Sequence, residues 1–264
     1  MATCYYRSLL SPIGQKAYDT YLNGFRNYKK SVVLPKEAQS IINNVIYALD
    51  HDYPEYFFAK PSSYLIYPDR IEASVRYIMP RDNASTILKM LDALANRLFT
   101  HACEAGMKTP LEVAAYFHDY ITDNIFYTTG DKTKERNHNM IGALINGSTV
   151  CDGYSQLYLY LLDHVGIPAL YVSGKTVGGS SGGHAWNMIN IGGTGRTKIT
   201  GGTWYHIDVT WDCKGPGRKG DWDYFMLSDD DIRAKKHILQ YKNGAKLPKC
   251  PHTMRLNRSA RRII

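Results

Sequence analysis

Cysteine is scarce in this chain, which has five cysteines scattered over 264 residues. The number is odd and no pair shows the short spacing of structural zinc sites, so a disulfide framework is not expected and a metal is not called for. No apolar run approaches the roughly 18 residues that span a membrane, and the first residues lack the apolar core of a signal peptide. We therefore expect a cytoplasmic protein with reduced thiols and no membrane partner, or a secreted one if an export signal has been removed.

Acidic residues are absent after Asp231, whereas the whole chain has a formal net charge of +8. We interpret residues 236–264 as a basic C-terminal tail. Such a tail could bind nucleic acid, but no aromatic residue follows Tyr241 and no recognition motif is present, so nucleic acid is a weakly supported partner. The basic residues concerned are Lys246, Lys249, Arg255, Arg258, Arg261 and Arg262.

Hydrophobic periodicity divides the rest of the chain into two parts. Residues 1–105 are predicted to form a mainly helical N-terminal region with a small β-hairpin, and residues 106–235 a core of helices and strands. In the core, helices are expected at 111–124, 140–145 and 151–165, followed by strands at 169–173, 185–191 and 203–211. A helix followed by an antiparallel sheet predicts the α+β class. Glycine-rich loops at 177–183 and 192–202 lack the Lys-Ser/Thr of a nucleotide-binding loop.

The most informative helix begins at Cys151. Apolar side chains at helical spacing from Tyr154 to Val165 predict a buried stripe, and Gly166 provides a C-terminal cap. A helix N-terminus favours the thiolate because its unpaired backbone N–H groups face a negative charge. Gly153, two residues later, would let a substrate backbone come close. The alternative for Cys151 is a small buried packing residue, which is what most lone cysteines are.

Two further residues complete a hypothetical catalytic constellation. His184 opens a strand directly after a flexible glycine-rich loop, so its imidazole could reach a cleft. If the strands at 185–191 and 203–211 form a hairpin with its turn at Arg196, Asp208 lies opposite His184, within reach of a hydrogen bond. Cys151, His184 and Asp208 would then act as nucleophile, base and orienting group.

The strings VCDGYSQL, GGHAWNMI and WYHIDVTWD, in this order, closely resemble the three catalytic segments of the transglutaminase-like superfamily, whose core is a papain-related Cys-His-Asp fold. The string DWDYFMLSDDDI is similar to the closing segment of many bacterial members. The resemblance covers roughly residues 110–232. It implies Cys151 as nucleophile, His184 as general base and acid, and Asp208 as orienter, with the nucleophile at a helix N-terminus packed on an antiparallel sheet. Beside Gly153, the predicted substrate-binding residues are Tyr154, Trp186 and Trp211, and core packing is an equal account of both tryptophans.

Several readings of this constellation remain open. The first is a cysteine-dependent hydrolase that cleaves peptide or isopeptide bonds of a protein or peptide substrate through a thioester, without a cofactor. A transamidase uses the same acyl-enzyme, and a non-catalytic peptide-binding module is a further alternative. A metal site could draw on Cys151, His184, His206, Asp208 and Cys213. The family's animal transglutaminases use an upstream tryptophan at the oxyanion, and here no tryptophan precedes the cysteine. The second oxyanion donor is therefore open among Tyr127, His138 and Asn139.

Overall fold

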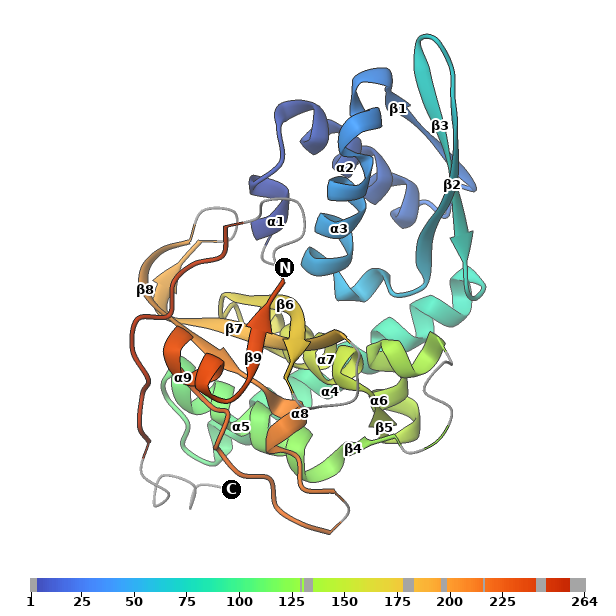
Figure 1. Cartoon of the computed structure of the whole chain (residues 1–264). Coiled ribbons are helices and arrows are strands. Elements are labelled where there is room, and N and C mark those ends of the chain that lie inside the picture. Colours follow the sequence, from blue (N-terminus) through green and yellow to red (C-terminus); the bar gives the residue numbers. More distant parts are fainter. Residues whose placement is uncertain are drawn as a thin grey trace.

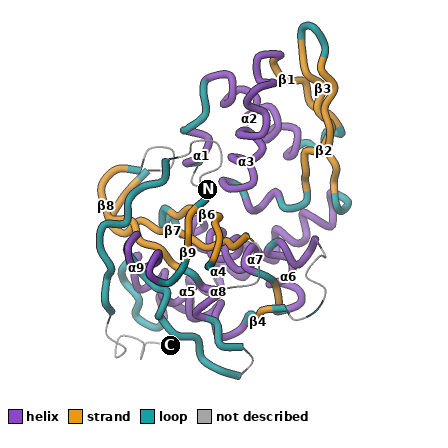
Figure 2. Tube along the Cα trace, in the orientation of Figure 1, coloured by secondary structure: helices purple, strands orange, loops and turns teal. Residues whose placement is uncertain are grey.

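The computed structural model describes residues 4–128, 130, 135–177, 183–195, 199–215, 217–240 and 246–256. An N-terminal region lies above a larger core, and α4 (Arg81–Glu104) leads from one to the other (Figure 1). Helices and strands occur in both parts (Figure 2), so the α+β class is confirmed. Among the described helices, none combines the length and apolar character needed to cross a membrane.

The N-terminal region packs helices beside a three-stranded antiparallel sheet of order β1-β3-β2. The predicted hairpin is present, with Ile66 opposite Ile71 at its turn. After β1, the chain forms a 3₁₀ turn that leads directly into a helix. The elements are α1 (Tyr5–Ser8), α2 (Pro12–Arg26), β1 (Ser31–Pro35), η1 (Lys36–Ile41), α3 (Ile42–Asp52), η2 (Pro54–Tyr56), β2 (Ala59–Ile66) and β3 (Arg70–Tyr77).

The core is built around α7 (Cys151–His164), which packs against an antiparallel sheet of order β8-β7-β6-β9. Further helices, α4 included, cover the other side of α7. The predicted boundary between residues 105 and 106 remains a prediction. The remaining elements are α5 (Pro110–Asn124), β4 (Phe126–Tyr127), η3 (Glu135–His138), α6 (Met140–Asn146), β5 (Ser148–Thr149), β6 (Ala169–Thr176), β7 (Gly183–Thr194), β8 (Thr200–Ile207), α8 (Val209–Asp212), α9 (Asp229–Ala234) and β9 (His237–Leu239).

Helix α7 begins where the sequence predicts and ends one residue earlier. Its apolar stripe faces inward, because Tyr154, Leu157 and Tyr158 are completely buried. The helix stops at His164, and Gly166 follows with a φ of 77°, a left-handed conformation that costs glycine little. The stripe therefore fixes the helix on the sheet and holds Cys151 at a defined place beside it.

One predicted strand boundary in the core is wrong. The strand expected over 203–211 ends at Ile207, and the chain turns at Asp208 into α8, whose first N–H groups bond that side chain. Within residues 236–264, the predicted basic tail, β9 pairs with β6, with His237 opposite Thr176. The hairpin turn expected at Arg196 and the basic residues Arg258, Arg261 and Arg262 lie outside the described residues.

The N-terminal region contacts the core through aromatic and polar side chains. The Tyr6 hydroxyl donates to the backbone oxygen of Tyr171 over 2.7 Å. The His51 ring lies edge-on to the Tyr171 ring, with 4.8 Å between centroids. Tyr171 in turn donates its hydroxyl to Asp152 over 2.8 Å. These contacts connect the N-terminal region to the residue directly after Cys151.

Candidate active site

Cys151 occupies the first turn of α7. The preceding residue, Val150, is extended and gives no side-chain cap, so the first N–H groups of the helix are left to other partners. Thr149 is tied back by a hydrogen bond from its hydroxyl to the Asn137 oxygen over 2.8 Å. Cys151 keeps 9% of its surface exposed. Cys151 therefore stands at the N-terminus of α7, beside the unpaired N–H groups of the first helical turn.

His184 lies at the start of β7 and bonds Asp208 through Nε2 and Oδ2, 2.5 Å apart. The predicted pairing is nevertheless wrong. The sheet register places Asn187 opposite Ile207, so Trp186 rather than His184 is the residue of β7 that comes level with Asp208. His184 lies two residues before Trp186 along β7. The carboxylate reaches His184 diagonally, since the chain leaves the strand at Asp208 to form α8.

The electrostatics of this pair favour two charges. Burial by itself would lower the pKa of His184, but the charge and hydrogen bond of Asp208, and then the hydrogen bond with Cys151, raise it to about 10. Burial would likewise raise the pKa of Asp208, whereas its imidazole partners hold it well below the usual range. Because Nε2 of His184 is engaged by Asp208, Nδ1 is the nitrogen left for the Cys151 sulfur. The structure therefore brings His184 and Asp208 into direct contact and places Cys151 close enough to act on the pKa of His184.

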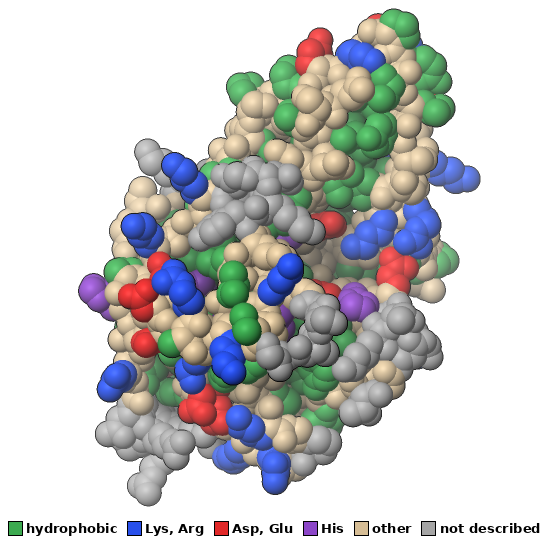
Figure 3. All heavy atoms as spheres, viewed as in Figure 1, with side chains coloured by type: hydrophobic (Ala, Val, Ile, Leu, Met, Phe, Trp, Pro, Cys, Tyr) green, Lys and Arg blue, Asp and Glu red, His purple; other side chains and the backbone are tan. Residues whose placement is uncertain are grey.

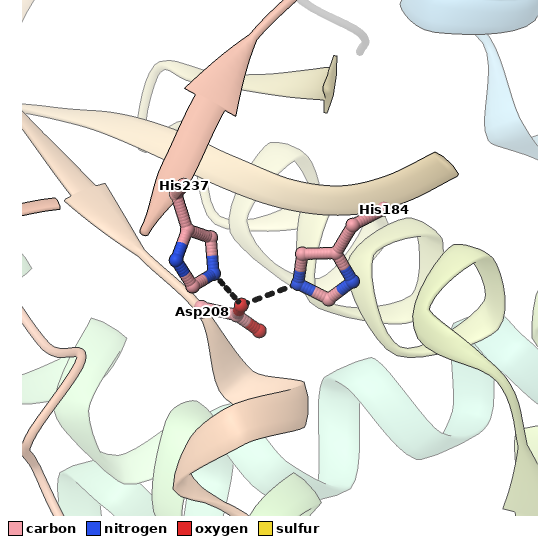
Figure 4. Close-up of side chains that lie close together, drawn as sticks. All are labelled: His184, Asp208 and His237. Atoms are coloured by element: carbon pink, nitrogen blue, oxygen red, sulfur yellow. Dashed lines mark hydrogen bonds and ion pairs between the residues drawn. The ribbon is translucent and has the colours of Figure 1, made fainter. Parts of the chain in front are cut away.

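His237 is a fourth member of the site that sequence reasoning missed. Its Nε2 lies 2.8 Å from Oδ2 of Asp208, the same oxygen that bonds His184. Figure 4 shows the two imidazoles approaching this carboxylate from two different strands. The sequence placed His237 in the basic tail, and a three-residue strand has no periodicity that could have revealed it.

Three of the four predicted substrate-binding residues belong to the core. Gly153 is buried, and a Cβ there would clash with the Thr149 side chain, so close packing explains the glycine. Tyr154 is fully buried, with its hydroxyl donated to the Ile125 oxygen over 2.8 Å. These positions cannot line a substrate cleft.

The two tryptophans differ. Trp186 is fully buried and donates its ring N–H to Nδ1 of His206 over 3.1 Å, so core packing is the correct account of this residue. Trp211 is half-buried, and its ring centroid lies 6.0 Å from that of His184. Trp211 is thus the member of the predicted set that stands at the accessible side of the site.

Of the three candidates for the second oxyanion donor, Tyr127 is best placed. Asn139 uses both ends of its amide within the protein, because Nδ2 donates to Glu135 and Oδ1 accepts from the Ile141 N–H. His138 bonds Asp152 over 2.6 Å. Tyr127 pairs with Thr149, two residues before the cysteine, and is 41% exposed. Burial, followed by the charge of Cys151, raises the pKa of Tyr127.

A cavity of about 200 Å³ adjoins the site between the N-terminal region and the core. Asp50 and Lys60 line it from the N-terminal region, and His138, Asp152 and Tyr171 from the core. The molecular surface is hollowed between these two parts (Figure 3). Both halves of the chain therefore shape the surface next to the residue that follows Cys151.

Two groups of described side chains bring three potential metal-ligand atoms within 4.8 Å of one another. The first is His184, Asp208 and His237, whose closeness follows from their hydrogen bonds. The second is His206, Asp229 and Cys250. Its imidazole is less suited to a metal, because Nδ1 accepts from Trp186 and a metal-bound histidine normally donates from its other nitrogen. Cys151 and Cys213, two of the residues considered from the sequence as possible metal ligands, lie in neither group.

A helix that begins at a cysteine packs on an antiparallel sheet, and a histidine of that sheet bonds an aspartate, which defines an α+β core with a cysteine, a histidine and an aspartate at one site. Residues 97–209 match the sequence model of the Transglutaminase-like superfamily, and the chain carries a domain of this superfamily. No curated protein matches the chain.

Solved structures are similar at low identity. A TGase is 15% identical over 80% of this chain and 58% of its own, with a TM-score of 0.40. A candidate cysteine protease from Cytophaga hutchinsonii is 16% identical over 58% of this chain and 61% of its own, with a TM-score of 0.33. The periplasmic domain of TgpA from Pseudomonas aeruginosa is 18% identical over 54% and 55%, with a TM-score of 0.32. The chain thus spans about three fifths of the length of these structures.

Proposed function

We propose that the protein is a cysteine-dependent hydrolase that cleaves amide bonds of a protein or peptide, with Cys151 as nucleophile, His184 as base and acid, and Asp208 as orienter. The observation that carries this proposal is the position of the His184 imidazole, which bonds Asp208 over 2.5 Å and lies near enough to Cys151 for that residue to help raise its pKa. This is the arrangement that activates a thiol toward a carbonyl carbon.

The chemistry follows from the protonation states that the site favours. The Cys151 thiolate attacks the carbonyl carbon, and the backbone N–H of the same residue faces the developing oxyanion, with the Tyr127 phenol as the second donor. The His184 imidazolium then protonates the leaving nitrogen as the C–N bond breaks, which leaves a thioester and a free amine. Water attacks the thioester while His184 accepts its proton, and a carboxylic acid and the thiolate are released.

The cavity between the two parts of the chain supports a peptide as substrate. It adjoins Asp152, and its walls combine charged residues with tyrosine side chains such as Tyr171. Residues from the N-terminal region would contact the substrate peptide on one side of the scissile bond, so this region would contribute to substrate specificity.

The test is an unbiased cleavage assay. A peptide library from a digested proteome is incubated with the protein, and new termini are identified by mass spectrometry. We expect cleavage by the wild type and none by Cys151→Ala. Cys103→Ala removes an exposed thiol remote from the site and serves as the matched control. Cleavage that persists in Cys151→Ala would overturn the proposal. Incorporation of a fluorescent primary amine into dimethylated casein, without cleavage, would instead identify a transamidase.

A further inference from the structure

We propose that His237 is a positioning residue of the site, held as an imidazolium on the carboxylate of Asp208, and that it sets how tightly His184 holds its proton. The proposal rests on the function proposed above insofar as it concerns the same triad. It goes beyond that function because it assigns a charge and a task to a residue outside the three catalytic segments.

The pairing of β9 with β6 fixes the position of His237. Strand β9 pairs antiparallel with β6, with Leu239 opposite Gly174. A Cβ at position 174 would meet both the Ile238 oxygen and the Trp186 ring, so a glycine is needed for β9 to lie here. The side chain of His237 is completely buried as a result. A buried imidazole must satisfy both ring nitrogens within the protein.

The hydrogen-bond partners of His237 are both acceptors. Nδ1 lies 3.0 Å from the Lys235 backbone oxygen, and Nε2 lies 2.8 Å from Oδ2 of Asp208. A carbonyl oxygen cannot donate, and an ionised carboxylate cannot donate either. A neutral imidazole carries only one N–H, so one of these two contacts would face lone pair to lone pair. Two protons on the ring satisfy both contacts.

The state of Asp208 supports this assignment. Its Oδ1 accepts from the Thr210 and Trp211 backbone N–H groups over 2.9 and 3.2 Å. Its Oδ2 faces both imidazoles. Four donors match the four acceptor positions of an ionised carboxylate, whereas a protonated one would have to donate to one of them. Asp208 is therefore the anion, and the second proton belongs to His237.

His206 shows the contrasting case in the same core. Its Nδ1 accepts from the Trp186 ring N–H, and its Nε2 lies 3.0 Å from Oδ1 of Asp229. One acceptor and one donor are what a neutral imidazole offers. Burial lowers the pKa of His206 more than the hydrogen bond and charge of Asp229 raise it, and the charge of His237 also lowers it. The two histidines therefore differ in charge because their partners differ.

The remaining groups around His237 are mostly aromatic. Its ring centroid lies 5.2 Å from those of His184 and Trp186, 4.9 Å from Trp211 and 5.4 Å from Tyr224. Aromatic rings tolerate a cation in a dry site better than aliphatic side chains do. The Lys235 ammonium lies over the Tyr224 ring, 4.4 Å from its centroid. Among the described residues, charged groups that act on the His237 imidazole include Asp208, the imidazolium of His184 and this ammonium.

The consequence concerns His184. A single negative charge is shared by two imidazoles whose ring centroids are 5.2 Å apart. Like charges at this distance, in a partly polarisable interior, repel enough to move a pKa by on the order of one to two units. His237 therefore lowers the proton affinity of His184 relative to an isolated His-Asp pair, which makes its proton easier to give to a leaving amine.

The experiment follows histidine protonation directly, by NMR with selective ¹⁵N labelling of the ring nitrogens. In the wild type at pH 7, we expect both nitrogens of His237 to show protonated chemical shifts. Titrations are then compared in a Cys151→Ala background, which removes the sulfur's effect on His184. Adding His237→Phe, or His237→Gln with its neutral donor, should raise the His184 midpoint by about one pH unit. The exposed His252→Gln is the matched control and should leave it unchanged.

Two results would overturn this inference: an unprotonated ring nitrogen on His237 at pH 7, or an unchanged His184 midpoint in His237→Gln. Neither readout uses turnover. Catalysis that survives Cys151→Ala would therefore refute the proposed function without touching the protonation of His237. The wild-type spectrum needs no substitution, so the test does not depend on whether a variant folds.

Discussion

Replacing Asp208 by asparagine separates its two tasks. An amide keeps one acceptor oxygen and gains an NH₂ group, so it cannot accept the four donors that surround the carboxylate. Asparagine is a good helix N-cap, and we expect its oxygen to stay with the Thr210 and Trp211 N–H groups, where Oδ1 now lies. The NH₂ group then faces His184 and His237. The fold is retained, but His184 loses its anion.

The magnitude follows from the state of His184. Its pKa is raised to about 10 from an ordinary 6.5, with Asp208 as the leading cause that opposes burial. A rise of this size corresponds to about 5 kcal/mol in favour of the imidazolium. Without the anion, the imidazolium no longer supports a thiolate near neutral pH. We expect turnover to fall by about 10³–10⁴, as loss of the aspartate does in the serine triad.

The assay is alkylation of Cys151 by iodoacetamide, followed by peptide mass spectrometry between pH 5 and pH 9. The wild type should react fast at the acidic end, and Asp208→Asn should react only as the pH approaches that of an ordinary thiol. Asp229→Asn is the matched control, because Asp229 bonds His206 over 3.0 Å on the same sheet. A wild-type rate at pH 6 in Asp208→Asn would refute the orienting role.

Three further predictions concern the surroundings of the site. If the Tyr127 phenol holds the oxyanion, Tyr127→Phe should lower kcat by about 10²-fold and leave KM little changed. Steady-state kinetics measures both constants, and an unchanged kcat would contradict this role. Gly153→Ala should destabilise the protein by about 1–3 kcal/mol, measured by urea unfolding, because the new Cβ clashes with Thr149; unchanged stability would contradict that packing. Burial by itself lowers the pKa of His118. The carboxylates of Asp119 and Asp212 outweigh burial and raise this pKa to about 9. The stabilisation by His118 is therefore complete below about pH 6.5 and lost as the pH rises through 9, so the melting temperature of the wild type should fall over that interval more than that of His118→Gln.

The sequence was most informative where a residue type and a regular pattern coincide. The start of α7 is visible because a stripe of apolar residues begins just after Cys151, and the pairing of β7 with β8 follows from two alternating segments. The end of β8 was not visible, because Val209 and Trp211 continue the alternation while the Asp208 side chain caps a helix. Periodicity cannot show a cap that replaces a strand.

The interior of the site was less accessible to sequence reasoning. A tryptophan beside a catalytic histidine fits a cleft wall and a buried core equally well, and only the tertiary packing decides that Trp186 is buried. His237 shows the same limit. Its strand is three residues long, and its place depends on a glycine in β6 and on a ring from β7, which are distant in the sequence.

Strand β9 has a consequence for any shortened form of the protein. The segment that matches the superfamily model stops at residue 209, and a fragment designed on that limit would keep all three predicted catalytic residues. It would nevertheless expose the backbone of β6 along one border and leave Asp208 with a single imidazole. An open strand invites association with other chains. We expect such a minimal domain to aggregate readily, and its weak activity would understate the chemistry of the intact molecule.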